Sequence, residues 1–569
     1  MLKCFNNKCK NQLIEDKFND IYVCPVCGLI YKCNGESIDK VDGTFKQKVE
    51  LTIPYGLIKI GDDAFSNCDA ITSVTIPDSV TTICRQAFEN CSALTTVIMG
   101  KNVSSIGYKA FSGCVSLKNF TIPDNVNCIE SSAFENCVSL ESLTLPQNLK
   151  IINDETFSNC KGIKRVELSD AITRIGFHAF NACSSLQNIT IPGRVIEIGY
   201  EAFEGCSSLK SIAIPGSVKE IGEYAFIGCY GLESITVDSD NGRYHSSGNC
   251  LIETEKKKLI FGCKNSVIPS DGSVTDIVRN AFENCKGLTN ITVPDSIITI
   301  GEEAFKNCGN LEKATIGDGV KNIVSEVFDG CDNLQYEEYG NAKYLGNHLI
   351  KATSTDITEI TIKSGTKTIA GGALNGCKAL TSVNVPESVV NIGEYAFSGC
   401  IGLRYIMVPD DAHIGFDAFD GCDNLQYEEY GNAKYLGNHL IKAVSTDITE
   451  VTIKDGTKTI AGGAFADCCK LKAVTMPDSL SVIGAYAFSG CEELSEIRIP
   501  DGVKTVNSGA FSYCDSLEEL LIPESVKYIG DSVFFMCDDD LAIYVKEEKQ
   551  TAEWNSDWNI DGGTVVWGD

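Results

Sequence analysis

The chain has 569 residues, 43% of them hydrophobic, which is enough material for a long buried core. Its formal net charge is −29 and its pI is near 4.6, which disfavours nucleic-acid backbones and anionic membrane surfaces as partners because both are polyanions. The sequence has no run of about 18 or more apolar residues, so we expect no membrane insertion.

The N-terminal residues favour a structural zinc site. Cys4 and Cys9 are followed by Cys24 and Cys27 in the sequence CPVCG, and four thiolates at short spacing are the ligands that structural Zn²⁺ prefers. Two disulfides or reduced surface thiols are the alternatives, but so short a segment cannot hold a fold by hydrophobic burial alone. Residues 1–43 resemble a zinc ribbon, although the first pair has a wider spacing than usual.

Zinc ribbons often bind nucleic acid, and this leaves a nucleic-acid-associated regulator as one alternative function. Residues 1–40 contain six lysines and five acidic residues, without a basic patch that interleaves with aromatic side chains. We therefore expect the module to act as a structural cap or a protein contact, with no nucleic acid as partner.

From about residue 44 a unit of 23 residues repeats along the chain. Phenylalanine recurs three residues before each repeated cysteine, and a fixed period between 20 and 50 residues is typical of stacked-repeat proteins. The first run of the cysteine column consists of Cys68, Cys91, Cys114, Cys137, Cys160, Cys183, Cys206 and Cys229.

Each unit predicts one turn of a solenoid. Ile212 and Ile214 alternate with polar or small residues as in a strand, and Pro215 ends that strand because it cannot donate a ladder hydrogen bond. The second half, from Val218 to Cys229, has helical or tight-turn spacing. Stacked coils bury their apolar side chains against each other, and roughly 21 coils at about 4.8 Å would give a curved body on the order of 100 Å long.

The unit C-x-x-L-x-x-I-x-I-P-x-x-V-x-x-I-G-x-x-A-F-x-x-C resembles that of BspA-like leucine-rich repeats, over residues 44–545. The resemblance implies an α/β solenoid with a parallel β-sheet along one face. Many members of the family are surface proteins that bind host or neighbouring-cell proteins, so a cell-surface adhesin is an alternative function. The N-terminal residues have no apolar core of a secretory signal, and we expect a cytoplasmic location, with the cell surface as the alternative.

The fixed register of the cysteines favours burial over a disulfide framework. Free cysteine behaves as a small hydrophobic residue and is among the most buried residue types. Coil spacing falls within disulfide Cα distances, which leaves bridges between neighbouring coils as the alternative. We expect free thiols along the column.

Three interruptions break the period, near residues 238–262, 335–352 and 426–443. Each contains Gly-Asn between short strand-like runs, which predicts β-hairpins projecting from one flank of the solenoid. Phe328–Ala352 is repeated without change as Phe419–Ala443, which indicates a recent internal duplication. Their tyrosines are candidate partner anchors, or they pack on the solenoid flank: Tyr336, Tyr344, Tyr427 and Tyr435.

Residues 546–569 contain all three tryptophans, and a terminal coil needs its open core covered, so we expect a C-terminal cap there. The outward strand positions form the expected interaction face. Threonine dominates their central row, as β-branching suits an exposed strand, and the exceptions to that row with their neighbours are candidate partner contacts. These contacts are Lys164, Arg165, Glu167, Arg404, Tyr405, Met407 and Arg498.

The sequence has no phosphate-binding Gly-rich loop and no His-Glu-x-x-His motif, and it has only five histidines. We therefore expect a non-enzymatic scaffold for protein–protein interaction that uses the strand-lined face of the solenoid. The partner is expected to be a protein.

Overall fold

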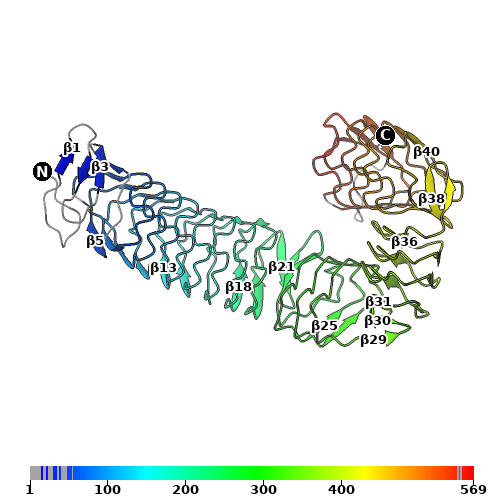
Figure 1. Ribbon diagram of the computed structural model, residues 1–569, viewed down its shortest axis with the longest axis horizontal. Helices are drawn as coiled ribbons and strands as arrows, with labels where there is room; N and C mark the ends of the chain where they lie inside the picture. The colour runs from blue at the N-terminus through cyan, green and yellow to red at the C-terminus, as the bar shows by residue number, and fades with distance from the viewer. Residues whose placement is uncertain are drawn as a thin grey trace.

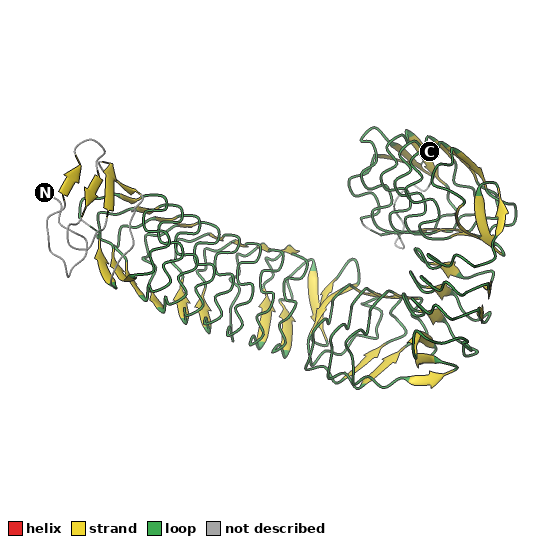
Figure 2. Cartoon of the chain, viewed as in Figure 1, coloured by secondary structure: helices red, strands yellow, loops and turns green. Residues whose placement is uncertain are grey.

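The structure is a computed structural model that describes residues 14–16, 21–23, 30–34, 37–39, 48–53, 55–546, 550, 554–555 and 557–568. It is a long solenoid of stacked coils, which runs from the N-terminal end and then curves back like a hook (Figure 1). The described residues contain no helix, as Figure 2 also shows, so the expected solenoid is confirmed but the helical part of its α/β class is wrong.

Two columns of short parallel strands run along the solenoid. Neighbouring coils pair residues 23 positions apart, as Ser105 pairs with Thr82 and Cys128. The first column consists of β5 (Val49–Thr52), β7 (Ile71–Thr75), β9 (Thr96–Ile98), β11 (Asn119–Phe120), β13 (Ser142–Thr144), β15 (Arg165–Glu167), β18 (Ser211–Ile214), β20 (Ser234–Val237), β25 (Asn290–Val293), β27 (Lys313–Ile316), β33 (Ser382–Asn384), β35 (Tyr405–Met407), β40 (Glu450–Thr452), β42 (Ala473–Thr475), β44 (Glu496–Ile497), β46 (Glu519–Ile522), β48 (Ala542–Val545) and β49 (Thr564–Trp567).

The second column is made of two-residue strands that follow the turn in the middle of each coil, and many of these turns contain proline. It consists of β6 (Lys59–Ile60), β8 (Thr82–Ile83), β10 (Ser105–Ile106), β12 (Cys128–Ile129), β14 (Ile151–Ile152), β16 (Arg174–Ile175), β17 (Glu197–Ile198), β19 (Glu220–Ile221), β24 (Asp276–Ile277), β26 (Thr299–Ile300), β28 (Asn322–Ile323), β32 (Thr368–Ile369), β34 (Asn391–Ile392), β36 (His413–Ile414), β41 (Thr459–Ile460), β43 (Val482–Ile483), β45 (Thr505–Val506) and β47 (Tyr528–Ile529).

Left-handed backbone explains why the second half of a coil forms tight turns rather than a helix. In the coil that ends at Cys206, Glu201 has φ 51° and Gly205 has φ 68°. Either value interrupts the right-handed α conformation. Asn and Gly tolerate positive φ best, and one of them precedes the repeated cysteine in most coils. Gly222 has a different cause, because a Cβ there would lie 2.4 Å from the backbone nitrogen of Tyr200 in the preceding coil.

The core is a column of stacked phenylalanine rings beside a column of cysteines. From Phe65 to Phe226 successive ring centroids are 5.2–5.7 Å apart and nearly parallel. From Cys91 to Cys229 each Sγ donates to the carbonyl oxygen of the phenylalanine 26 residues earlier, at 3.1–3.3 Å. The cysteines of the described repeat are free thiols, as their register predicts.

The interruptions form three-stranded units that are built into the solenoid wall, so the expectation of projecting hairpins is wrong. In each unit two antiparallel pairings lead to a last strand that pairs in parallel with the second column, as β31 does with β32 and β39 does with β41. The strands of the three units are β21 (Tyr244–Ser247), β22 (Cys250–Glu253), β23 (Lys258–Gly262), β29 (Glu337–Tyr339), β30 (Ala342–Leu345), β31 (His348–Ala352), β37 (Glu428–Tyr430), β38 (Ala433–Leu436) and β39 (His439–Ala443). The predicted Gly-Asn pairs are indeed two-residue turns between antiparallel strands.

Both ends of the solenoid are extended by further strands. β1 (Ile14–Asp16), β2 (Ile21–Val23), β3 (Ile30–Asn34) and β4 (Ser37–Asp39) form an antiparallel meander, and β4 pairs in parallel with β6. At the other end Trp554 and Trp558 are buried, and Trp558 packs edge-on against Phe534, the last phenylalanine of the ring column.

The C-terminal coils return toward the middle of the chain (Figure 1). Lys256, which follows β22, forms an ion pair of 2.7 Å with Asp557 near the C-terminus. The pair joins residues 301 positions apart and closes the hook.

Candidate functional site

The candidate contacts around β15 are exposed charges that already pair with each other. Arg165 lies 2.9 Å from Glu167, and Lys164 lies 3.3 Å from Glu141 in the preceding coil. All four side chains are more than half exposed, so these pairs contribute little to stability. A partner that used them would first have to compete with the existing ion pairs.

The candidate contacts around β35 form an exposed group, which we call the β35 patch and define as Arg404, Tyr405 and Met407. Tyr405 is 58% exposed and Met407 is 68% exposed, whereas the central outward row to which Met407 belongs carries mostly threonine. Large exposed aromatic and apolar side chains that lie together are typical of protein-binding surfaces. The structure therefore brings three of the predicted residues, Arg404, Tyr405 and Met407, into one surface.

A pocket of about 460 Å³ lies in the coil that follows the β35 patch. The backbone N–H of Gln426 donates to the carbonyl oxygen of Arg404 at 3.1 Å, which places the pocket wall directly beside the patch. The pocket is lined by Cys422, Asp423, Leu425, Gln426, Tyr427, Glu429, Lys434 and Lys442. The pocket wall thus carries both acidic and basic side chains, and the exposed side chains of Tyr405 and Met407 lie next to it.

Tyr427 forms part of the pocket in a cationic setting. The ammonium groups of Lys434 and Lys442 lie 5.8 and 5.5 Å from its ring centroid. Burial raises the pKa of the Tyr427 hydroxyl, and that oxygen makes no hydrogen bond to the part of the chain that the structure describes. In the duplicate unit, Tyr336 has the same arrangement between two lysines.

Tyr344 and Tyr435 are not partner anchors, and that prediction is wrong. Their side chains are almost completely buried, and their hydroxyl oxygens accept the backbone N–H groups of Lys363 and Lys454 at 3.0 and 3.2 Å. Since alternation along β30 and β38 turns them into the core, they tie each unit to the following coil. The tyrosines of these units that do lie nearly half exposed are Tyr339 and Tyr430.

Two further sets of predicted residues lie apart from the β35 patch. Arg498 is exposed after β44, on the same row of the first column but in a later coil. The predicted zinc ligands Cys4, Cys9, Cys24 and Cys27 lie outside the described residues, so zinc there stays a prediction.

A group of titratable side chains that sequence reasoning missed lies on the turns after the second column. His178 Nδ1 lies 3.1 Å from a carboxylate oxygen of Glu201, and Glu204 completes the group. Burial and the neighbouring Glu201 carboxylate raise the pKa of Glu204 to about 7. Burial opposes ionisation of Glu201, but hydrogen bonds with Glu204 and Tyr200, together with His178, outweigh it and lower its pKa. The available signal was that His178 and Glu201 are 23 residues apart, which makes them neighbours in successive coils.

The model of the BspA type leucine rich repeat region matches residues 43–164, 151–271, 257–354, 352–468 and 434–550, which together span most of the sequence. The chain belongs to the BspA-type leucine-rich repeat family. No curated protein sequence matches this BspA-type protein.

Several solved structures similar to this BspA-type protein are leucine-rich repeat proteins. A leucine-rich cell-surface protein from Faecalibacterium prausnitzii is 27% identical, with 71% of this chain and 93% of that chain covered and a TM-score of 0.41. A leucine-rich repeat protein from Bacteroides ovatus is 22% identical over 88% of this chain and 98% of that chain, with a TM-score of 0.34. The pneumococcal vaccine antigen PcpA is 17% identical over 88% and 94%, also with a TM-score of 0.34.

The search for membrane spans in the BspA-type chain covered the described residues. None of these residues forms a helix that is long and apolar enough to cross a bilayer.

Proposed function

We propose that this BspA-type protein is a non-catalytic scaffold that binds a protein partner through the β35 patch and the adjoining pocket. The observation that carries the proposal is the exposure of Tyr405 and Met407 side by side on the strand-lined face. An aromatic anchor beside a pocket with charged walls is the arrangement in which a few residues supply most of the binding free energy.

The duplicated units provide an internal comparison for the patch. The unit that contains Tyr336 follows β27, which presents Lys313 and Thr315 outward, whereas the identical unit that contains Tyr427 follows β35. The two sites therefore share the lysine-flanked tyrosine and differ in the apolar group beside it. This difference supports the β35 side as the place where apolar surface is available to a partner.

The charges around the patch indicate what the partner presents. Lys434 and Lys442 line the pocket together with Asp423 and Glu429, so both signs of charge are available at its wall. The apolar centre with a charged rim matches the composition of protein interfaces. A partner segment would insert an apolar side chain beside Tyr405 and place polar groups over the pocket.

Replacing the anchors should remove binding without affecting the fold. For the double variant Tyr405→Ser, Met407→Thr we expect an amount of cross-linked partner at least 30-fold lower than for the parent. The reason is that loss of a central anchor costs about 2 kcal/mol or more of binding free energy. The measurement is quantitative cross-linking in cell extract, with each captured protein confirmed by direct binding to the purified full chain.

The matched control is the variant Lys313→Ser, Thr315→Ser, which changes the corresponding row beside the identical unit. It should bind as the parent does. Equal retention by the parent and the Tyr405, Met407 variant would contradict the proposal, provided that the variant has the circular dichroism spectrum and unfolding midpoint of the parent.

Where the protein acts is a separate proposal. The cytoplasmic location predicted from the N-terminal residues stays a prediction, and a cell-surface adhesin with the same patch is its alternative. Zn²⁺ at the N-terminal cysteines and a role as a nucleic-acid-associated regulator likewise remain predictions, independent of the β35 patch.

A further inference from the structure

A mixed group of nitrogen and oxygen donors lies on the turn that links β16 and β17 to the next strands of the solenoid. Ligand atoms of His178, Glu201 and Glu204 all lie within 4.8 Å of one another. The side chains of His178 and Glu201 are 33% and 20% exposed, so the group is partly desolvated and still open to solvent on one side. This combination suits a bound ion that keeps one or more water ligands.

The neighbouring side chains hold the three donors in place. The His178 ring packs edge-on against Tyr200, with centroids 5.5 Å apart, and the amide nitrogen of Asn181 donates to a carboxylate oxygen of Glu204. The Tyr200 hydroxyl also donates a hydrogen bond to the Glu201 carboxylate. Such outer contacts orient ligands in metal sites, because they fix the ring and the carboxylates before the ion arrives.

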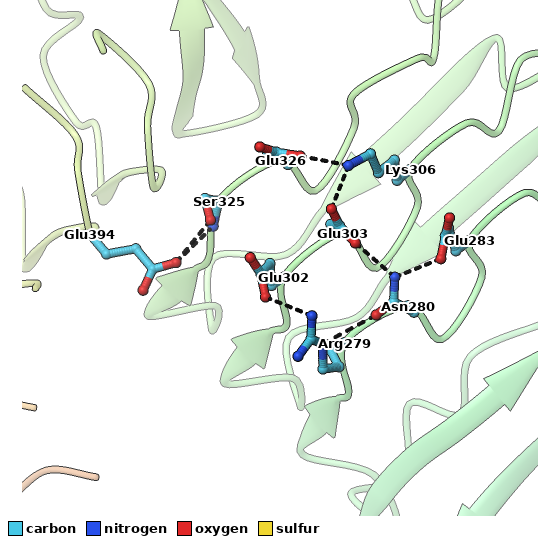
Figure 3. Close-up of polar contacts among 9 residues, drawn as sticks. All are labelled: Arg279, Asn280, Glu283, Glu302, Glu303, Lys306, Ser325, Glu326 and Glu394. Atoms are coloured by element: carbon cyan, nitrogen blue, oxygen red, sulfur yellow. Dashed lines mark hydrogen bonds and ion pairs between the residues drawn. The ribbon is translucent and has the colours of Figure 1, made fainter. Parts of the chain in front are cut away.

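The turn positions of Glu201 and Glu204 recur in a later coil, where a lysine takes the position of Glu204 (Figure 3). Glu303 takes the register of Glu201, and Lys306 takes that of Glu204. The Lys306 ammonium group contacts Glu303 and lies 2.7 Å from Glu326 in the next coil. The Lys306 ammonium group is thus the cation that brings together the carboxylates of two successive coils, those of Glu303 and Glu326.

In the group of His178, Glu201 and Glu204, a second carboxylate, that of Glu204, occupies the position that Lys306 has in the later coil. In the described part of the chain, Glu201 and Glu204 form no ion pair with lysine or arginine, and His178 is the neighbouring imidazole that contacts Glu201. Two carboxylates in contact repel each other unless a proton or a cation lies between them.

We propose that His178, Glu201 and Glu204 bind one divalent transition-metal ion, through the imidazole Nδ1 and one oxygen of each carboxylate. One imidazole with two carboxylates suits ions such as Mn²⁺ or Zn²⁺, and two negative ligands balance the charge of the ion. Ligand atoms around such an ion lie about 3.3 Å apart in tetrahedral geometry, close to the 3.1 Å between His178 and Glu201. The ion would clamp two successive coils, as Lys306 does.

Titration with Mn²⁺ tests the site in the full-length protein. Mn²⁺ is the probe because thiolates bind it weakly, which separates this site from the predicted zinc ligands at the N-terminus. Electron paramagnetic resonance of free Mn²⁺ in about 0.15 M salt, at which exposed charges are screened, should show one site that is tighter than the remaining acidic surface. His178→Asn and Glu204→Gln should each weaken that site at least 10-fold. His245→Asn is the matched control and should bind Mn²⁺ as the parent does. His245 is a partly exposed histidine of another unit, in which it contacts Thr254.

A charge-replacement variant keeps the test independent of folding defects. Glu204→Lys places a lysine beside Glu201, as Lys306 lies beside Glu303, so we expect it to fold, to lose the Mn²⁺ site, and to have an unfolding temperature that Mn²⁺ does not raise. The parent should show such a rise. Equal Mn²⁺ binding by the parent, His178→Asn and Glu204→Lys would overturn the proposal, and so would a parent that shows no Mn²⁺ site tighter than the surface background.

Discussion

Raising the pH above about 9 should unfold the repeat steeply, because burial disfavours ionisation of many column cysteines in the folded chain. Burial is the main cause that raises the thiol pKa from 9.0 to about 11 or 12, and seven described thiols show such values: Cys68, Cys114, Cys229, Cys250, Cys285, Cys468 and Cys537. Since the folded pKa is the higher one, the stabilisation is complete below pH 9 and is lost as the pH rises toward 11–12. Each thiol costs about 1.4 kcal/mol per pH unit in that window, so seven together cost on the order of 10 kcal/mol per pH unit.

Circular dichroism across pH 7–11 measures this loss of strand structure, and pulsed alkylation followed by mass spectrometry reports which thiols become accessible. Cys469 is the internal control, because it is exposed and lies next to the buried Cys468. It should react before the transition, whereas the cysteine column should react only within it. An unchanged spectrum up to pH 11, with the column still unmodified, would rule out this linkage.

Phe180→Ala should destabilise the solenoid by about 3–5 kcal/mol, which is the usual cost of removing a buried phenylalanine side chain. Phe180 is completely buried, and its ring centroid lies 5.5 Å from those of both Phe157 and Phe203. A cavity at this point interrupts the column on which both neighbouring coils pack, because each coil contacts only its neighbours. The measurement is urea unfolding followed by circular dichroism at neutral pH.

The matched control is Phe180→Leu, because the chain itself places a leucine in this column. Leu374 is completely buried, and its carbonyl oxygen accepts the thiol of Cys400 as a phenylalanine carbonyl does elsewhere. The leucine variant should lose less than half of what the alanine variant loses. If alanine and leucine were equally tolerated, the ring column would not be a main source of stability.

The 23-residue period predicts the solenoid well because it fixes which residues become neighbours. Ser105 pairs with Thr82 for that reason, and the phenylalanine and cysteine columns follow from the same register. The spacing of the second half left a helical turn and tight turns as alternatives, although Asn or Gly before the cysteine was a visible sign of left-handed backbone. Periodicity alone cannot separate a helical turn from two turns with positive φ, such as those at Glu201 and Gly205.

The sequence predicted the exposed residues of β35 but not the pocket beside them, and the reason is physical. Met407 stands out in sequence because it interrupts a row of threonines, Tyr405 flanks that row, and the structure leaves both exposed. The pocket at Tyr427 depends on how a three-stranded unit packs against the preceding coil, which the period does not describe. Burial of Tyr344 follows from the same packing. The curve of the hook also lies beyond a linear pattern, because it accumulates from small rotations between successive coils.

The identity of the two inserted units has a consequence for how this gene can change. Phe328–Ala352 recurs 91 residues later as Phe419–Ala443, so recombination between the copies would remove or add 91 residues in a single event. Both junctions would fall within identical sequence, and β31 or β39 would still pair with the coil that follows. The resulting chain would keep its stacked core while the arc between Lys256 and Asp557 changed in length. Such an event would change the reach and curvature of the solenoid while keeping the strand pairing at the junction.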